Sequence, residues 1–307
     1  MCTAMRLPLL VAAAAPLLLA NAEVTSAESA PIPPQIKAML DAAIASGDEG
    51  AVATIVKYAS GAAPDSAAAI AKVADDWKKV RAAEKTAKIE QAGIFDLWSG
   101  RAEIGGFIST GNSPSEGVSA SLALTRDGLN WRHKLKFQAD YQRSLGVTSR
   151  EHYLAAWEPN WKLGERAYVY GAAQYESDRF LGFTSRYSVS TGAGYSALKT
   201  ERAKLDVELG PAYRATYFTD GGDERSIAAR GSVDFAWKFA KGLQLTQNAA
   251  AYVERYNSTV TGTTALNAKV LGPLSAQFSY NVQYESMPPD GRATTDTISR
   301  AGLSYAF

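Results

Sequence analysis

Residues 129–143 read LNWRHKLKFQADYQR, and this stretch decides the fold class. Apolar and polar side chains alternate along it with a period of two. The odd-numbered positions hold Leu129, Trp131, His133, Leu135, Phe137, Ala139 and Tyr141, and the even-numbered ones hold Asn130, Arg132, Lys134, Lys136, Gln138, Asp140 and Gln142. Successive side chains of a β-strand point to opposite faces. The stretch therefore predicts a strand with one apolar and one charged face.

The same alternation recurs between residue 97 and residue 307, most clearly at 203–209, 227–238 and 274–285. It predicts twelve strands that begin near residues 97, 116, 129, 149, 166, 184, 202, 224, 242, 259, 273 and 295. Each spans about ten to fifteen residues, whereas strands of soluble proteins are most often about five or six residues long. A soluble sandwich buries its apolar faces between two sheets, but an outer-membrane barrel turns them to lipid.

The connections between these strands favour the barrel. Short turns, as at Asp127-Gly128 and Lys241-Gly242, alternate with longer loops, as at 177–184 and 286–296. Short periplasmic turns and long external loops are typical of outer-membrane barrels, in which an even number of strands leaves both chain ends on one side.

Aromatic side chains on the apolar face fit the two girdles of such a barrel. Trp131 and Tyr141 are ten residues apart, which is about 33 Å along a strand at about 3.3 Å per residue. For a strand tilted near 45°, the height becomes about 24 Å, close to the apolar band of about 25 Å. Trp237 and Phe307 are further predicted girdle residues.

The last predicted strand carries Ala301, Leu303, Tyr305 and Phe307 on one face. This resembles the terminal signature by which the outer-membrane insertion machinery recognises its clients. Backbone groups at an open sheet edge cannot stay unpaired in hydrocarbon, so the strands must close into a cylinder. We therefore expect a mainly β protein with a 12-stranded antiparallel transmembrane β-barrel at 97–307, preceded by a small N-terminal α-helical periplasmic segment.

The first 22 residues have the pattern of a secretory signal peptide: Arg6, an apolar run at 7–20, and Ala20-Asn21-Ala22 before the expected cut. Cys2 would leave with this segment, so the mature chain would contain no thiol. A linker is expected at 23–33, followed by an α-helical periplasmic segment at 34–92.

Apolar side chains at helical spacing predict three short helices in that segment. The expected stripes are Ile36, Met39, Leu40, Ala43 and Ile44; then Val52, Ile55, Val56 and Ala59; then Ile70, Val73, Trp77 and Val80. Gly47 should end the first helix and Asp48 should cap the second. The segment is either a spacer or a module that binds a periplasmic partner or itself through residues 34–90.

Composition excludes several classes. The chain has 307 residues, of which 46% are hydrophobic and 21% charged, with 32 Lys and Arg against 31 Asp and Glu. This is neither a disordered protein nor a strongly basic one, and no nucleic-acid partner is expected.

Seven short motifs, taken in order, resemble one known family. They are WSG at 98–100, GGF at 105–107, STGNS at 109–113, WRH at 131–133, YESDRF at 175–180, GAGY at 192–195 and LGPAYR at 209–214. In this order and spacing they resemble the salt-induced outer-membrane proteins, a domain-of-unknown-function β-barrel family. The resemblance covers about 97–307 and implies a barrel in the outer membrane of a Gram-negative bacterium. It implies no substrate and no catalytic residues.

The inward-facing charges are the candidate functional residues. The predicted lumen-lining residues are Arg132, Lys134, Lys136, Asp140, Glu176, Lys204, Asp206, Glu208, Arg214, Arg230, Asp234, Lys238, Glu254, Glu285 and Arg300. In the lumen we also expect Tyr168 to cover Gly194 and Tyr170 to cover Gly192, which would secure the barrel strands. Twelve strands lie between the filled lumen of eight and the aqueous channel of sixteen.

These residues predict a narrow, weakly selective solute channel or an envelope-stress protein without catalysis, in contact with outer-membrane lipid. The alternative is a structural or interaction protein with a closed lumen. An outer-membrane lipid hydrolase is a more distant alternative. Outer-membrane phospholipases have a His-x-Ser pattern, and His133 is not followed by a serine two residues later. No catalytic residue, cofactor or metal site is predicted.

Overall fold

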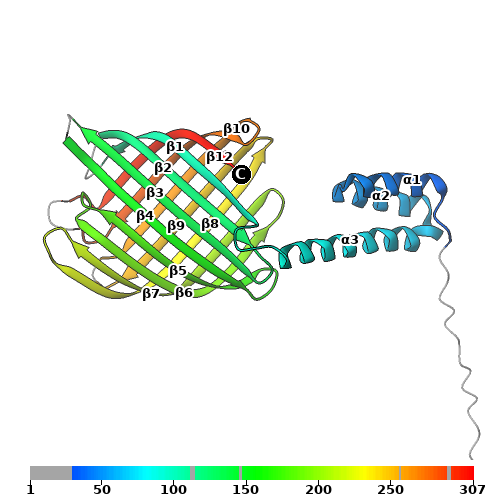
Figure 1. Cartoon of the computed structure of the whole chain (residues 1–307), viewed down its shortest axis with the longest axis horizontal. Coiled ribbons are helices and arrows are strands. Elements are labelled where there is room, and N and C mark those ends of the chain that lie inside the picture. Colours follow the sequence, from blue (N-terminus) through cyan, green and yellow to red (C-terminus); the bar gives the residue numbers. More distant parts are fainter. Residues whose placement is uncertain (1–29, 111–114, 145–146, 256, 289–291) are drawn as a thin grey trace, which may run out of the picture. The chain divides into compact units, whose positions relative to one another are not determined.

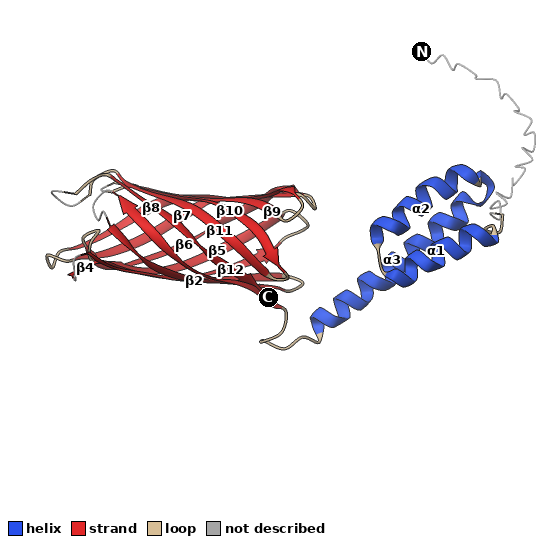
Figure 2. Ribbon diagram, turned by 90° about the horizontal axis from the view of Figure 1, so that it is seen from above, coloured by secondary structure: helices blue, strands red, loops and turns tan. Residues whose placement is uncertain are grey.

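A computed structural model describes residues 30–110, 115–144, 147–255, 257–288 and 292–307. The predicted signal peptide and most of the predicted linker lie outside these residues. The chain divides into two compact units, Met1–Glu84 and Lys85–Phe307. The second unit is a closed antiparallel barrel of twelve strands, drawn in Figures 1 and 2.

Each strand pairs with its neighbours in sequence, and the first strand pairs with the last. The strands are β1 (Trp98–Thr110), β2 (Ser115–Asp127), β3 (Trp131–Ser144), β4 (Val147–Lys162), β5 (Ala167–Asp178), β6 (Phe183–Lys199), β7 (Ala203–Phe218), β8 (Asp223–Ala240), β9 (Leu243–Glu254), β10 (Thr259–Leu271), β11 (Leu274–Glu285) and β12 (Thr295–Ala306). Every strand begins within two residues of its expected start. The fold predicted from the alternation of side chains is therefore confirmed.

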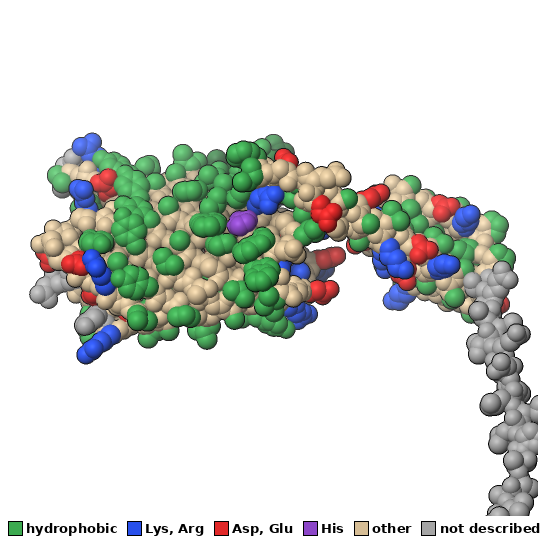
Figure 3. All heavy atoms as spheres, turned by 60° about the horizontal axis from the view of Figure 1, so that its bottom comes forward, with side chains coloured by type: hydrophobic (Ala, Val, Ile, Leu, Met, Phe, Trp, Pro, Cys, Tyr) green, Lys and Arg blue, Asp and Glu red, His purple; other side chains and the backbone are tan. Residues whose placement is uncertain are grey.

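The two ends of the cylinder differ. The end that holds the turns after β2, β4, β6, β8 and β10, together with both ends of the barrel sequence, is the short-turn end; the opposite end is the loop end. The outer wall is apolar, and Figure 3 shows hydrophobic side chains spread over it while charged ones gather towards the ends. Trp131, Tyr141, Trp237 and Phe307, the expected girdle residues, are 42% to 55% exposed. Trp131 stacks on Trp161 at 6.1 Å between ring centroids.

Two glycine pairs bring neighbouring strands unusually close. A Cβ atom added to Gly302 of β12 would lie 2.7 Å from the Cα of Gly105 of β1. One added to Gly210 of β7 would lie 2.7 Å from the Cα of Gly192 of β6. Glycine in a strand often marks a close backbone approach or a bend of a barrel wall. The β6/β7 and β12/β1 seams are six strands apart in either direction around the barrel, so the two close approaches lie on opposite sides.

The first unit is a small helical bundle formed by α1 (Pro34–Ser46), α2 (Glu49–Ala62), a 3-10 turn at Pro64–Ser66 and α3 (Ala67–Glu90), which continues into the second unit. Gly47 ends α1 with a φ of 70°, and the Asp48 carboxylate accepts hydrogen bonds from the first turn of α2. The core is Leu40, Ala43, Val52, Ala59, Ile70 and Ala74. No helix among the described residues combines the length and the apolarity needed to cross a bilayer.

Two expected core positions of this bundle are wrong: Met39 is 57% exposed and Val80 is 56% exposed. The buried face of α1 is narrower than the apolar stripe expected from the sequence. Its buried residues are Leu40 and Ala43. Helix α3 has 24 residues and α2 has 14. On α3 the bundle core contains Ile70 and Ala74, with Val73 and Trp77 packed against it, and Val80 lies beyond the end of this core.

Candidate functional site in the barrel lumen

Polar side chains surround a cavity of about 670 Å³ inside the barrel. At about 30 Å³ per molecule, this volume corresponds to about twenty waters. The lining extends from Thr125 and Lys204 near the short-turn end to Gln283 and Asp296 near the loop end. It contains as many Lys and Arg as Asp and Glu side chains. The cavity is therefore a long and electrically balanced space with room for water.

One group of ion pairs lies on the wall formed by β3, β4, β7 and β8. The Lys134 ammonium is 2.6 Å from Glu158 and 3.4 Å from Asp234. The Arg230 guanidinium is 2.9 Å from Glu208, whose other oxygen accepts a hydrogen bond from the Tyr168 hydroxyl. Lys134 and Asp234 lie on β3 and β8, which are not neighbours in the sheet, so charges are paired across the interior as well as between adjacent strands.

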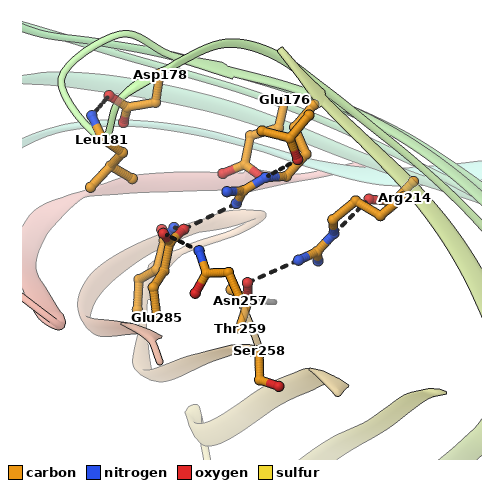
Figure 4. A network of polar contacts seen from close by, with 12 residues as sticks. Glu176, Asp178, Leu181, Arg214, Asn257, Ser258, Thr259 and Glu285 are labelled. Carbon is orange, nitrogen blue, oxygen red and sulfur yellow. Dashed lines mark hydrogen bonds and ion pairs between the residues drawn. The ribbon is translucent and has the colours of Figure 1, made fainter. Parts of the chain in front are cut away.

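A second group of contacts, here called the loop-end layer, is formed by Arg186, Arg214, Glu254, Asn257, Thr259 and Glu285. Arg186 pairs with Glu285 at 3.1 Å, and Arg214 pairs with Glu254 at 2.7 Å. Figure 4 shows Arg214 reaching Thr259 and the amide of Asn257 reaching Glu285. Five of the six residues are buried, and the side chain of the sixth, Glu254, is only 2% exposed. The layer fills part of the lumen near the loops.

Between these two groups lies His152. Its ring nitrogens are 3.3 Å from Asp140 and 3.3 Å from Glu176, and Arg300 of β12 approaches Asp140 at 2.7 Å. The imidazole is thus enclosed by two carboxylates. The second histidine, His133, lies outside, where it stacks between Trp131 and Trp157 at 6.0 and 6.2 Å. No group of three or more metal-binding side chains occurs in the described part of the chain.

Aromatic rings support several of the buried arginines. The guanidinium carbons lie over ring centroids for Arg186 and Phe183 at 3.9 Å, Arg214 and Tyr252 at 4.0 Å, Arg132 and Tyr168 at 4.9 Å, and Arg230 and Tyr170 at 5.0 Å. A guanidinium over an aromatic face is attracted by the ring quadrupole. These stacked pairs fill the lumen beside β3 to β9.

The two expected tyrosine–glycine contacts differ in the structure. The register pairs Tyr168 with Gly194 and Tyr170 with Gly192. A Cβ atom on Gly194 would meet the Tyr168 ring, whereas one on Gly192 would meet the backbone of Leu209 and Gly210. Gly194 therefore makes room for a neighbouring ring, and Gly192 makes room for the adjacent strand.

Gly194→Ala is expected to destabilise the barrel by about 1–3 kcal/mol, because its methyl group would displace the Tyr168 ring. In a Tyr168→Ala background the same change should cost little, so the two sites should be coupled by about 0.5–3 kcal/mol. Urea unfolding followed by tryptophan fluorescence measures all four forms. Gly262→Ala, whose new Cβ would be 3.8 Å from its nearest neighbour, is the control. Additive costs at 168 and 194 would contradict the contact.

The structure distributes the predicted lumen residues over four places. The cavity lining contains Lys134, Lys136, Asp140, Glu176, Lys204, Asp206, Arg230, Asp234 and Arg300. Arg132 and Glu208 lie beside it in the ion pairs of the same wall, and Arg214, Glu254 and Glu285 belong to the loop-end layer. Lys238 is exposed near the short-turn end, beside a register shift between Trp237 and Ala240, and is not part of the lining.

Comparison with known proteins places the barrel in a family. Residues 102–307 match the family described as "Protein of unknown function, DUF481". The chain belongs to this family. The match confirms the resemblance that the motifs indicated, and the closed twelve-stranded barrel is the fold that this resemblance implied.

One curated relative is the "Uncharacterized protein YdiY" of Escherichia coli strain K12, which is 25% identical over 210 residues, or 68% of this chain and 82% of the relative. Among solved structures, the NanC porin is 12% identical with a TM-score of 0.47 and covers 67% of this chain and 98% of its own. The KdgM porin in complex with disordered oligogalacturonate is 13% identical with a TM-score of 0.39, over 67% of this chain and 99% of its own.

Several lumen residues of this DUF481 barrel were missed by the sequence reasoning. Glu158 shares the inward parity of β4, and its contact with Lys134 follows from the register of β3 and β4. Arg150 and Asp178, which pair at 3.4 Å, lie close to loops, where the alternation is weaker. The inward residues of β9, β10 and β11 that line the cavity are uncharged, so a pattern of charges does not mark them.

Proposed function

We propose that this protein is a narrow, weakly selective channel for small polar solutes in the outer membrane. The observation that carries the proposal is the cavity, whose lining reaches from residues near one end of the barrel to residues near the other. A structural barrel has no need for a hydrated space of this length. The loop-end layer would then form the constriction, since it fills part of the lumen at the end with the longer connections.

The charge distribution supports weak rather than strong ion selectivity. Selective ion pores carry rings of one sign of charge. In this lumen Lys and Arg are balanced by Asp and Glu, and most are paired within 4 Å of an opposite charge. A passing ion would therefore meet little net field.

Conductance of the full mature protein in planar lipid bilayers tests the proposal. We expect small, discrete current steps and a reversal potential near zero in a gradient of potassium chloride. The same protein denatured by heat before reconstitution is the control, and it should give no steps. Electrical silence of correctly folded protein, checked by its heat-modifiable migration on a gel, would overturn the channel.

The loop-end layer favours a second candidate, a closed barrel with a structural or interaction role. Buried ion pairs such as Arg214 and Glu254 could seal the lumen completely. In that case the helical unit would carry the function by binding a periplasmic protein or a second copy through residues 34–90. Crosslinking of these residues in cells, combined with electrical silence in bilayers, would establish this candidate in place of the channel.

A further inference from the structure

We infer that the lumen is built for uncharged, hydroxyl-rich solutes and that the wall formed by β9, β10 and β11 is their contact surface. This inference rests on the proposed channel function and adds to it the chemical class of the solute. It follows from a difference between the two halves of the lumen that the balance of charges alone does not reveal.

The β9–β11 wall carries no charge where it lines the cavity. Among the described residues, its polar lining consists of Thr246, Asn248, Thr261, Thr263, Gln277, Ser279, Asn281 and Gln283. Ala250 and Ala265 also line the cavity, and their short side chains protrude little into it. Hydroxyl and amide groups both donate and accept hydrogen bonds. The wall therefore offers a mixed donor and acceptor surface over much of the length of the cavity.

The charges on β7 and β8, the strands beside this wall, are paired with one another. The Lys204 ammonium is 3.0 Å from Asp206, and Arg230 is 2.9 Å from Glu208. A charged solute would have to compete with these pairs while losing part of its own hydration, which is costly for an ion in a confined space. An uncharged solute meets no such competition and exchanges water for equivalent hydrogen bonds.

Three amides of the neutral wall are held in place. The amide nitrogen of Asn281 donates to the Thr263 hydroxyl at 2.6 Å, and that of Asn248 donates to Asp234 at 2.6 Å. The amide nitrogen of Gln277 donates to Glu103 at 2.9 Å. Fixing one N–H orients the group and leaves a second N–H for a solute. Neighbouring hydroxyl groups of a polyol can both donate to and accept from such a surface.

Equilibrium exchange of radiolabelled glucose, gluconate and glucosamine into proteoliposomes tests the inference. The three probes share a six-carbon skeleton and differ in charge, and no net charge moves during exchange. We expect glucose to exchange several-fold faster than either charged probe. Equal rates, or faster exchange of a charged probe, would overturn the inference while leaving the channel intact. Exchange of none of the three would overturn the channel itself, and the inference with it.

A pair of substitutions on β10 assigns the effect to the neutral wall. Thr261→Val together with Thr263→Val removes two lumen hydroxyls with little change of shape, and we expect glucose exchange to fall several-fold more than small-ion conductance does. Thr264→Val is the matched control, because Thr264 lies on the same strand with the opposite parity and outside the cavity lining. Unchanged glucose exchange in the folded double variant would show that the wall does not contact the solute.

Discussion

Replacing Gly210 with alanine is expected to destabilise the folded barrel by about 3 kcal/mol or more, at the upper limit of overpacking costs. The new Cβ would lie 2.7 Å from the Cα of Gly192 and 2.8 Å from the carbonyl carbon of Thr191. Both atoms belong to the backbone of β6, so no side chain can rotate away. Strand β7 would have to move outward from β6, at the cost of the hydrogen bonds between them.

The loss should appear as a smaller fraction of heat-modifiable folded protein on a gel and as a lower urea midpoint in vesicles. Gly231→Ala is the matched control. It lies on β8 beside the same part of β7, and its new Cβ would have neighbours no closer than 3.8 Å. A Gly210→Ala protein as stable as the control would show that the β6/β7 seam does not require this close approach. Gly302→Ala should resemble Gly210→Ala, because Gly302 meets Gly105 in the same way at the β12/β1 seam.

Removing both charges of the Arg186–Glu285 pair should widen the loop-end layer and raise the single-channel conductance several-fold. In the double variant Arg186→Ser with Glu285→Ser, two long side chains that are 3% and 7% exposed become short ones. Removal of both partners leaves no uncompensated buried charge, whereas removal of one partner costs about 3–5 kcal/mol. The single variant Glu285→Ser should therefore lose stability, since it leaves Arg186 and Asn257 without their shared carboxylate.

Bilayer recordings of the wild type, the double variant and a control measure the conductance, and urea unfolding measures the stability. Arg225→Ser with Asp223→Ser is a suitable control, because this exposed pair near the loop end lies outside the layer. Unchanged conductance in a folded double variant would mean that the constriction lies elsewhere in the lumen. Equal stability of the single and double variants would contradict the mutual dependence of Arg186 and Glu285.

The sequence was sufficient for the architecture because the physical signal is repeated in every strand. In β3, from Trp131 to Gln142, the alternation of apolar and polar side chains indicates which face of the sheet each residue occupies. A one-residue shift in the pairing of this strand would place its charged side chains in lipid. The same alternation placed Asp140 and Lys134 in the interior. It could not show which strand each charge would meet, because this depends on the stagger of the strands when the barrel closes.

Other features could not be predicted because they depend on neighbours that are distant in the sequence. The contact between Asp140 and Arg300 joins residues 160 positions apart. The close approach of Gly105 and Gly302 is invisible until the first and last strands meet. Lys238 was expected to line the lumen by parity, but the irregular register after Trp237 interrupts the alternation there. Met39 and Val80 have the helical spacing of buried residues. That spacing does not show how far the core of the helical bundle extends along each helix.

The ion pairs across the lumen also have a mechanical consequence. Arg300 reaches Asp140 from β12 to β3, Lys134 reaches Asp234 from β3 to β8, and Arg186 reaches Glu285 from β6 to β11. These ion pairs cross-link strands that are not adjacent in the sheet. Flattening the barrel would therefore require several of the ion pairs to break together. We therefore expect the cross-section of the barrel to resist deformation, and any change in the width of the lumen to come from rotation of individual side chains.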